Sequence, residues 1–369
     1  MGILARGVEH AGRTERQPRR HCRVVGSHLP CVPRGGCGCP CPRIVQRRIV
    51  KDVCHRRAAS SLPHEGTTMA GQPAAHRDVE LVAVSHDVIA TWPIGTFLEN
   101  IAVIGDDEFV VSVHNKAELH RATVDGRSHE WVSMPAPPAG MIVSDGVIVV
   151  GGEPGAGPHH VYRVTTGGRV EDLAPVPDTL FLNGFTSGPV GIGFTVDSIL
   201  GVVIAIDLAT GASRVVLRDD LLTKVSEEPM LPGANGIKAG DDALYLTNTD
   251  RALVLRAPLD ASGMPVGTLD IVAENLRGDD LAVAANGDLF VTTHIHNTLI
   301  RLAPDGTRVA VAGPLQGMAG STSCVFGRTP ASRTSLFVTT TGGMVMPQDG
   351  VVQEAKLVRL DVGVAGRDG

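Results

Sequence analysis

Four oxygen-bearing side chains stand at the heads of similar short segments and could together hold a metal ion. Glu99 precedes Asn-Ile-Ala-Val, Asn183 precedes Gly-Phe-Thr, Asn235 precedes Gly-Ile-Lys and Asp279 precedes Asp-Leu-Ala-Val. Each segment is otherwise largely apolar, so burying its polar head is costly unless that head gains a partner. Two carboxylates and two amide oxygens suit Ca²⁺ or Mg²⁺ better than zinc. Asn-Gly and Asp-Asp are also ordinary turn residues, and only their shared register favours a common site.

These segments belong to a repeat that runs through most of the chain. The repeat heads fall at residues 99, 140, 183, 235, 279 and 321, with steps of 41, 43, 52, 44 and 42 residues. Each unit continues into short apolar, β-branched strands and a turn, as at Asn286-Gly287. A period of roughly 40–50 residues is typical of β-propellers. The sequence therefore predicts an all-β, six-bladed propeller with four antiparallel strands per blade, whose innermost strands line a central channel.

We expect the propeller to occupy residues 78–362 of the 369, between tails at 69–77 and 363–369. A propeller closes its ring when an N-terminal strand joins the last blade, which also removes an open sheet edge. Residues 79–85 alternate in polarity and predict that strand, and residues 355–362 offer its partner.

Residues 1–68 differ in composition from the rest of the chain. They carry 13 Lys and Arg against 4 Asp and Glu, and six of the seven cysteines. We expect this leader to be disordered and not a native part of the protein, with Met69 as the true start. A transit peptide and a zinc site at Cys31, Cys37, Cys39 and Cys41 are the alternatives, although the cysteine spacing is unlike that of usual zinc knuckles.

The composition excludes several classes of function. After residue 68 the chain is acidic and has no basic stripe, so we expect a small-molecule substrate and no nucleic acid. Since no apolar run of about 18 residues and no secretory signal occurs, we expect a cytoplasmic protein without a membrane partner. A single cysteine after residue 68, Cys324, suits a reducing compartment. Serine-hydrolase elbows, phosphate loops and dinucleotide fingerprints are absent.

Residues 96–362 resemble the gluconolactonase/regucalcin family of six-bladed propellers. The resemblance rests on Leu98-Glu99-Asn-Ile-Ala-Val, Asn183-Gly184, Asn235-Gly236-Ile237, and Asp279-x-Leu-x-Val followed by Asn286-Gly-Asp-Leu-Phe. It implies a divalent metal, most often Ca²⁺ with Mg²⁺, Mn²⁺ or Zn²⁺ as alternatives, held by Glu99, Asn183, Asn235 and Asp279. It also implies metal-dependent hydrolysis of lactones or related esters, with Asp279 as the catalytic base.

The chain departs from the family pattern at several positions. Where the family usually has Asp-Gly, this chain has Asp279-Asp280, so Asp280 is a second choice as ligand. Where the family often has Asn-Asp, this chain has Asn183-Gly184 and so lacks that carboxylate. The sequence Leu-Glu-Asn-Ile-Ala-Val around Glu99 more closely resembles a divergent branch of the family, which includes pericyclase-like biosynthetic enzymes. The alternatives are therefore a metal-independent pericyclase-like enzyme, with Phe185, Phe194, Met230 and Met344 as apolar lining, or a non-catalytic small-molecule-binding propeller.

Polar residues at the ends of second strands are candidates for substrate binding. His114, Asn248 and His294 occupy these places, and the alternative is that they are ordinary solvated loop residues. His159 and His160 lie in a loop rich in glycine and proline, where we expect them at the surface. Glu227 and Glu228 lie in an insertion that could cover the channel mouth or simply be solvated.

Overall fold

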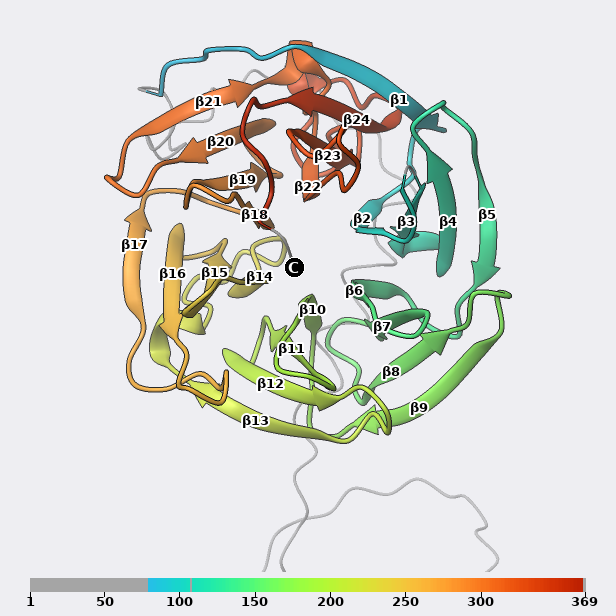
Figure 1. Ribbon diagram of the computed structural model, residues 1–369, viewed down its shortest axis with the longest axis vertical. Helices are drawn as coiled ribbons and strands as arrows, with labels where there is room; N and C mark the ends of the chain where they lie inside the picture. Colours follow the sequence, from blue (N-terminus) through green and yellow to red (C-terminus); the bar gives the residue numbers. More distant parts are fainter. Residues whose placement is uncertain (1–78, 107, 368–369) are drawn as a thin grey trace, which may run out of the picture. The chain divides into compact units, whose positions relative to one another are not determined.

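The computed structural model describes residues 79–106 and 108–367, and these form six four-stranded antiparallel sheets around a central axis (Figure 1). The predicted six-bladed propeller is thereby confirmed. Blade one consists of β2 (Leu98–Val103), β3 (Glu108–Val113), β4 (Glu118–Thr123) and β5 (Ser128–Ser133). Blade two consists of β6 (Pro138–Val143), β7 (Val147–Gly151), β8 (His159–Val164) and β9 (Val170–Val176). Blade three consists of β10 (Leu182–Ser187), β11 (Ile192–Asp197), β12 (Val202–Asp207) and β13 (Ser213–Arg218). Blade four consists of β14 (Ala234–Ala239), β15 (Ala243–Asn248), β16 (Leu253–Pro258) and β17 (Asp270–Glu274). Blade five consists of β18 (Leu281–Val283), β19 (Leu289–Thr293), β20 (Thr298–Leu302) and β21 (Arg308–Ala312). Blade six consists of β22 (Ser321–Phe326), β23 (Ser335–Thr340), β24 (Ala355–Asp361) and β1 (His86–Trp92). The leader predicted for residues 1–68 and the tail at 69–77 lie outside the described residues.

The ring closes through strands from both ends of the propeller. β1 pairs antiparallel with β24, so the last blade takes its outermost strand from the N-terminal side, as expected. The closing strand is His86–Trp92, however, and not residues 79–85. Those residues lie along blade five instead, where the Val82 amide donates to Ala310 O at 2.8 Å and the Val84 amide donates to Val311 O at 2.9 Å.

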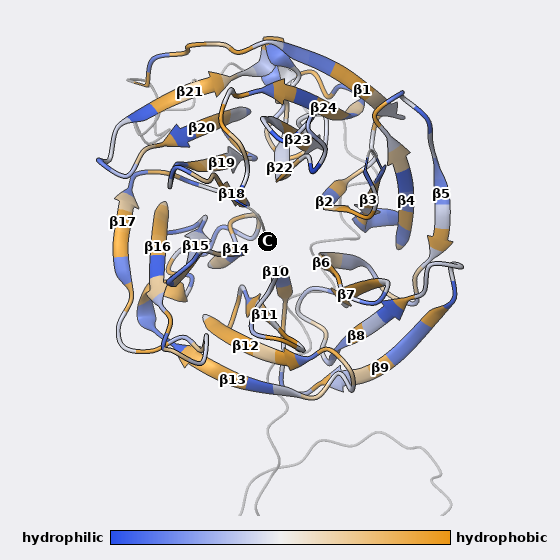
Figure 2. Ribbon diagram, in the orientation of Figure 1, coloured by the Kyte–Doolittle hydropathy of each residue, from blue (hydrophilic) through white to orange (hydrophobic). Residues whose placement is uncertain are grey.

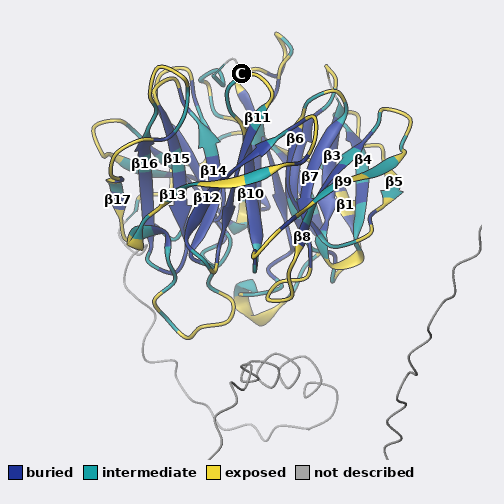
Figure 3. Ribbon diagram, turned by 90° about the horizontal axis from the view of Figure 1, so that it is seen from below, coloured by how far each residue is buried: buried dark blue, intermediate teal, exposed yellow. Residues whose placement is uncertain are grey.

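The core consists of six apolar clusters, and each lies between two neighbouring blades. Val, Leu, Ile and Ala make up most of each cluster, as the aromatic content of 3% requires, and a few aromatic side chains such as Phe194 and Phe290 join them. Outermost strands have one face in solvent and are more polar, as a comparison of β5 in blade one with the apolar third strand β12 of blade three shows (Figure 2). Buried residues therefore fill the blades, while exposed ones gather in the loops at the two ends of the ring (Figure 3).

Helical structure in the described residues is limited to four short 3₁₀ turns, η1 (His114–Lys116), η2 (Asp220–Leu222), η3 (Pro314–Gln316) and η4 (Gln348–Gly350). None of the helices in this part of the chain has the length and apolar character that a membrane crossing requires.

Candidate functional site

A bulge near the start of the innermost strands brings the predicted ligands into equivalent positions. In five blades the register between the first and second strands shifts across two residues, for example between Leu98 and Ile101 and between Ala234 and Ile237. In blade five the Asp279 amide and the Asp280 carbonyl both bond to Thr292, just ahead of β18. The first residues of the six bulges are Glu99, Ala139, Asn183, Asn235, Asp279 and Thr322.

Four of these six positions are the predicted metal ligands. In blades two and six the equivalent residue is Ala139 or Thr322, one position away from the expected heads Gly140 and Ser321. Ala139 has no ligating group, and Thr322 donates to Leu98 O at 2.7 Å. The ring therefore concentrates its carboxylates and amides on four blades, and we call this region the acidic end of the channel.

The second bulge residue is often glycine because the next blade lies against it. A Cβ on Gly184 would be 2.6 Å from Asn235 O, and one on Gly236 would be 2.6 Å from Asp280 Cα. The Gly236 amide also donates to Asp279 O at 2.8 Å. The Asn-Gly pairs thus permit innermost strands to touch, which fixes the spacing between successive predicted ligands.

The two predicted carboxylate ligands repel each other. Burial, and then the negative charges of Asp279 and Asp280, raise the pKa of Glu99 well above its usual value. No hydrogen bond or ion pair joins the Glu99 carboxylate to another described residue. Burial also raises the pKa of Asp279, although His294 and Asn235 oppose that shift. Such an arrangement is unfavourable without a cation.

Asp279 is held from two sides. Asn235 Nδ2 donates to Asp279 Oδ1 at 2.8 Å, and His294 Nδ1 lies 3.2 Å from Asp279 Oδ2. The other ring nitrogen of His294 lies 3.1 Å from Thr341 Oγ1. Because an ionised carboxylate only accepts hydrogen bonds, the Nδ1–H of His294 donates to it. The structure thus brings His294 to the predicted base.

Two hydroxyl groups set the direction of the two asparagine amides. Ser198 Oγ donates to Ala234 O at 2.6 Å, so it accepts from Asn183 Nδ2 at 3.3 Å. Thr249 Oγ1 donates to Gly278 O at 2.6 Å, so it accepts from Asn235 Nδ2 at 2.9 Å. A hydroxyl has only one proton to give, and neither Oδ1 receives a hydrogen bond from the described chain. Both amide oxygens remain available as ligands.

Ser198 and Thr249 belong to a second set of equivalent residues, which sequence reasoning identified only in part. Each lies two residues after the second-strand residue opposite the bulge, as His114 does after Ser112. The set comprises His114, Gly152, Ser198, Thr249, His294 and Thr341. The blade-four member is Thr249, one residue after Asn248. The Asn248 amide instead donates to Leu221 O at 2.8 Å and Thr223 O at 3.1 Å, and so holds the insertion after blade three.

His114 and His294 share an aromatic neighbour that the sequence did not single out. Phe97 lies 5.9 Å from the His114 ring and 5.4 Å from the His294 ring, edge-on to the latter. His114 Nδ1 lies 3.0 Å from Pro138 O, and burial lowers the pKa of this histidine. Because the two histidines come from blades one and five, Phe97 bridges them beside Glu99.

Asp280 faces a different partner from Asp279. Lys238 Nζ lies 2.8 and 2.6 Å from its two carboxylate oxygens, and Ser323 Oγ donates to it at 2.5 Å. Lys238 thus neutralises Asp280, whereas no Lys or Arg side chain in the described part of the chain reaches Asp279. The geometry favours Asp279 over Asp280 as the ligand.

Several other residues that the sequence singled out lie away from the acidic end. His159 is fully buried, not superficial, because Gly152 leaves room for its ring, and burial lowers its pKa. Met230, Glu227 and Glu228 are exposed on the insertion. The apolar side chains Phe185 and Phe194 are buried and border a cavity lower in the channel.

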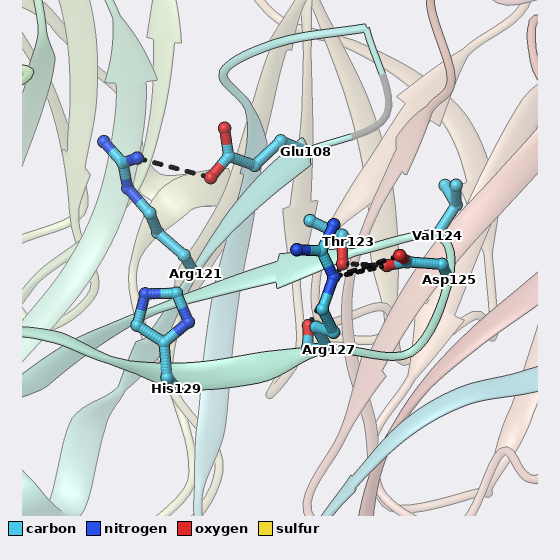
Figure 4. Close-up of a pocket in the computed structure, with 7 residues that line it drawn as sticks. All are labelled: Glu108, Arg121, Thr123, Val124, Asp125, Arg127 and His129. Atoms are coloured by element: carbon cyan, nitrogen blue, oxygen red, sulfur yellow. Dashed lines mark hydrogen bonds and ion pairs between the residues drawn. The ribbon is translucent and has the colours of Figure 1, made fainter.

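A hollow of about 590 Å³ on the rim of blade one is a weaker candidate (Figure 4). Its charged groups already satisfy each other, since Arg121 pairs with Glu108 at 3.3 Å and Arg127 pairs with Asp125 at 3.0 Å. The lining leaves no charge that a ligand would neutralise.

A metal at the acidic end would depend on the amides as well as the carboxylates. No group of three or more His, Cys, Asp and Glu side chains within residues 79–106 and 108–367 could hold an ion. Glu99 and Asp279 with the two oriented amide oxygens form a hard-oxygen donor set that fits Ca²⁺ or Mg²⁺. The unpartnered Glu99 carboxylate is the observation on which this fit depends.

Comparison with solved structures shows the same fold. The calcium-binding protein regucalcin from Agrobacterium tumefaciens is 17% identical with a TM-score of 0.59, over 78% of this chain and 97% of that one. A luciferin-regenerating enzyme is 14% identical with a TM-score of 0.60, over 78% and 98%. A "putative gluconolactonase" is 16% identical with a TM-score of 0.57, over 79% and 97%.

Two sequence comparisons place the chain more closely. A "Putative hetero-Diels-Alderase" from Phoma sp. is 28% identical over 148 residues, which is 38% of this chain. The match spans only 42% of that relative's length. The family model described as the SMP-30/Gluconolactonase/LRE-like region matches residues 109–342, well over half of the sequence. The chain therefore belongs to the SMP-30/gluconolactonase/LRE-like family.

Proposed function

We propose that the chain is a metal-dependent hydrolase of lactones or related esters, with its site at the acidic end of the channel. The unpartnered carboxylate of Glu99, facing the carboxylates of Asp279 and Asp280, is the observation that carries the proposal. With Lys238 offsetting Asp280, the ionised carboxylates of Glu99 and Asp279 carry two negative charges, which one divalent cation would balance. Family membership supports the same reading.

Four residues would hold the cation, namely Glu99, Asp279 and the Oδ1 atoms of Asn183 and Asn235. A divalent cation bound there would supply Lewis acidity toward an ester carbonyl, and Ca²⁺ suits these oxygen donors. Ser198 and Thr249 keep the amide oxygens turned toward it. Outer partners of this kind hold ligands in the geometry that binding requires.

Asp279 serves as the base in this scheme. A water molecule gives a proton to the Asp279 carboxylate while its oxygen attacks the substrate carbonyl carbon. The ring C–O bond then breaks, and the proton passes to the departing alkoxide, so that a hydroxy acid forms. Burial raises the pKa of Asp279 above its usual value, which makes it a better proton acceptor than an exposed aspartate. Asn235 and His294 fix its orientation.

A pH-stat assay over a panel of γ- and δ-lactones, with and without added metal, tests the proposal. We expect metal-dependent acid release that Asp279→Asn abolishes. Asp242→Asn, which changes an exposed aspartate on blade four, is the control and retains full activity. Unchanged turnover in Asp279→Asn would contradict the proposal, as would a bound metal with no lactone hydrolysed.

A second candidate is a metal-independent pericyclase-like reaction, which the partial match to the hetero-Diels–Alderase favours. In that case the channel would bind a reactive polyene, and Phe97 with its two histidine neighbours would contact it. Product formation from such a substrate in the presence of EDTA would favour this candidate. A third candidate, a non-catalytic binding propeller, predicts ligand binding without turnover of either substrate class.

A further inference from the structure

The channel has a cavity at the end away from Glu99 and Asp279. Its volume is about 610 Å³, within the range of small-molecule sites. The later halves of the innermost strands of blades one to four and six line it, including Ile101, Met141 and Phe185. The polar bulge residues precede these side chains on the same strands, so the two sites lie in sequence along one channel.

The walls of this cavity are largely apolar. Ile101 and Val103 come from blade one, Met141 from blade two, Phe185 from blade three and Val325 from blade six. Leu259 and Ala261 of the blade-four outer hairpin extend the wall outward. An apolar molecule entering here would displace water from several blades at once.

Three cationic side chains border the cavity, and none of its lining residues is acidic. Lys238 is paired with Asp280, and Arg367 is 2.6 Å from Asp241 and donates to Ala239 O at 2.8 Å. Arg328 is exposed and has no ion pair within the described residues. We call this region the basic end of the channel.

The C-terminal segment helps to build the basic end. After β24 the chain crosses the ring toward its centre (Figure 1). The Gly366 amide donates to Arg333 O and the Arg367 amide donates to Val283 O, so the segment is fixed to blades five and six. A Cβ on Gly366 would lie 2.4 Å from Phe326, which shows how closely the segment packs. Arg367 is thereby held at the cavity.

We propose that the basic end binds a small organic anion, with an apolar body in the cavity and a carboxylate on Arg328. A guanidinium group presents paired donors that match a carboxylate, and it keeps its charge at all accessible pH values. Lys238 and Arg367 are paired with Asp280 and Asp241, so Arg328 is the lining cation that a carboxylate would meet without an ion-pair partner among the described residues. This proposal does not depend on a metal at the acidic end or on lactone hydrolysis.

Isothermal titration calorimetry with octanoate, octanol and octylammonium tests the proposal, because these probes share one alkyl chain and differ in charge. We expect octanoate to bind the full chain at least about tenfold more tightly than octanol, and octylammonium to bind most weakly. Arg328→Gln should remove the preference for octanoate and leave octanol unchanged. Arg214→Gln, which changes an exposed arginine on β13, is the matched control and keeps the preference.

A second pair of variants tests the same pocket by adding charge. Ala261→Asp places a carboxylate at the exposed rim and should weaken octanoate binding about tenfold, whereas Ala209→Asp on a distant exposed turn should not. Equal affinities for octanoate and octanol, or equal losses in Arg328→Gln and Arg214→Gln, would overturn the proposal. So would octanoate binding that disappears in Asp279→Asn and survives in Arg328→Gln, because the carboxylate would then bind at the acidic end.

Discussion

At the scale of single residues, the acidic end brings buried carboxylates close to one another, and a bound cation would offset their repulsion. The pKa of Glu99 is raised in the folded protein above its ordinary value of 4.5. The folded state therefore holds this proton to higher pH than the unfolded state does, and the free energy of unfolding falls as pH rises through that window. Without metal, the ionised Glu99 lowers the free energy of unfolding by its full amount above the raised pKa, and this loss is absent below about pH 4.5.

Glu99→Gln should consequently stabilise the metal-free protein at neutral pH. The melting temperature in EDTA should rise in the variant, and its advantage over the wild type should shrink as pH falls toward 4.5. Added Ca²⁺ should reverse the order, because binding to the native state stabilises only a protein that retains the site. Thermal scans at several pH values, with EDTA and with Ca²⁺, measure both effects. A variant less stable than the wild type in EDTA at neutral pH would contradict this account.

The hydroxyls behind the amides should matter for metal affinity more than for folding. Ser198→Ala and Thr249→Val free the amides of Asn183 and Asn235 to turn, and we expect roughly ten- to hundredfold weaker Ca²⁺ binding in calorimetric titration. Thr195→Val is the matched control, since its buried hydroxyl donates to Gly184 O at 2.9 Å and touches neither amide. Equal losses of affinity in all three variants would show that the hydroxyls only support the blades.

The sequence suggests the proposed ligand residues more readily than the residues that support them. Glu99, Asn183, Asn235 and Asp279 each stand in a local pattern, a polar head before apolar strand residues, which repeats along the chain. Ser198 and Thr249 instead act through hydrogen bonds to Ala234 and Gly278 on the following blade, which no local pattern contains. Aligning Thr247-Asn-Thr249 with Thr292-Thr-His294 would have selected Thr249 over Asn248.

At the scale of the element, close contact between innermost strands controls the site. Gly236→Ala would place a Cβ 2.6 Å from Asp280 Cα and 2.7 Å from Asp279 O, both backbone atoms of blade five. We expect this overpacking to cost about 1–3 kcal/mol in chemical denaturation and to move Asp279, so that Ca²⁺ binding also weakens. Gly105→Ala, whose Cβ would meet only an ordinary contact at 3.6 Å, should change neither measurement. If Gly236→Ala keeps the stability and the Ca²⁺ affinity of the wild type, the close strand contact at Gly236 does not set the position of Asp279.

The sequence predicts the blades because each strand alternates or is wholly apolar, but it misplaces the closing strand. β1 is the outermost strand of its sheet, and only Ala90 and Trp92 of its seven residues are buried. Its polar start at His86 and Asp87 hides the periodicity. Residues 79–85 look more regular, yet pairing with a different partner, the edge of blade five, decides where they lie. Which edge a strand joins is a tertiary choice that a local pattern does not contain.

At the scale of the whole propeller, charge is divided along one channel. Asp280 contacts Lys238 and Ser323 from neighbouring blades, at the boundary between the acidic and basic ends. A cation at one end and an anion at the other would each meet a complementary potential. The ring geometry makes this division possible because successive residues of six innermost strands stack in layers around one axis.

The same ring depends on one N-terminal strand, which yields the last prediction. β1 covers the edge of β24, and Trp92 donates from Nε1 to His120 Nδ1 at 3.0 Å, which ties the last blade to blade one. A fragment of residues 79–369 should therefore melt cooperatively at the temperature of the full chain, as the sequence-based boundary also implies. A fragment of residues 93–369 should lose cooperative melting and aggregate, because it exposes an unpaired strand edge.

Trp92→Ala separates the effect of the side chain from that of the strand. Trp92 is 4% exposed, so its truncation should cost about 3–5 kcal/mol, as for other large buried residues. Trp92→Phe keeps most of the ring volume and loses the hydrogen bond to His120, which should cost only about 0.5–1.5 kcal/mol. Denaturant titration of the three proteins measures these differences. If residues 93–369 melt as the longer fragment does, closure by β1 does not hold the ring together, and contacts between the other blades must be sufficient for the fold.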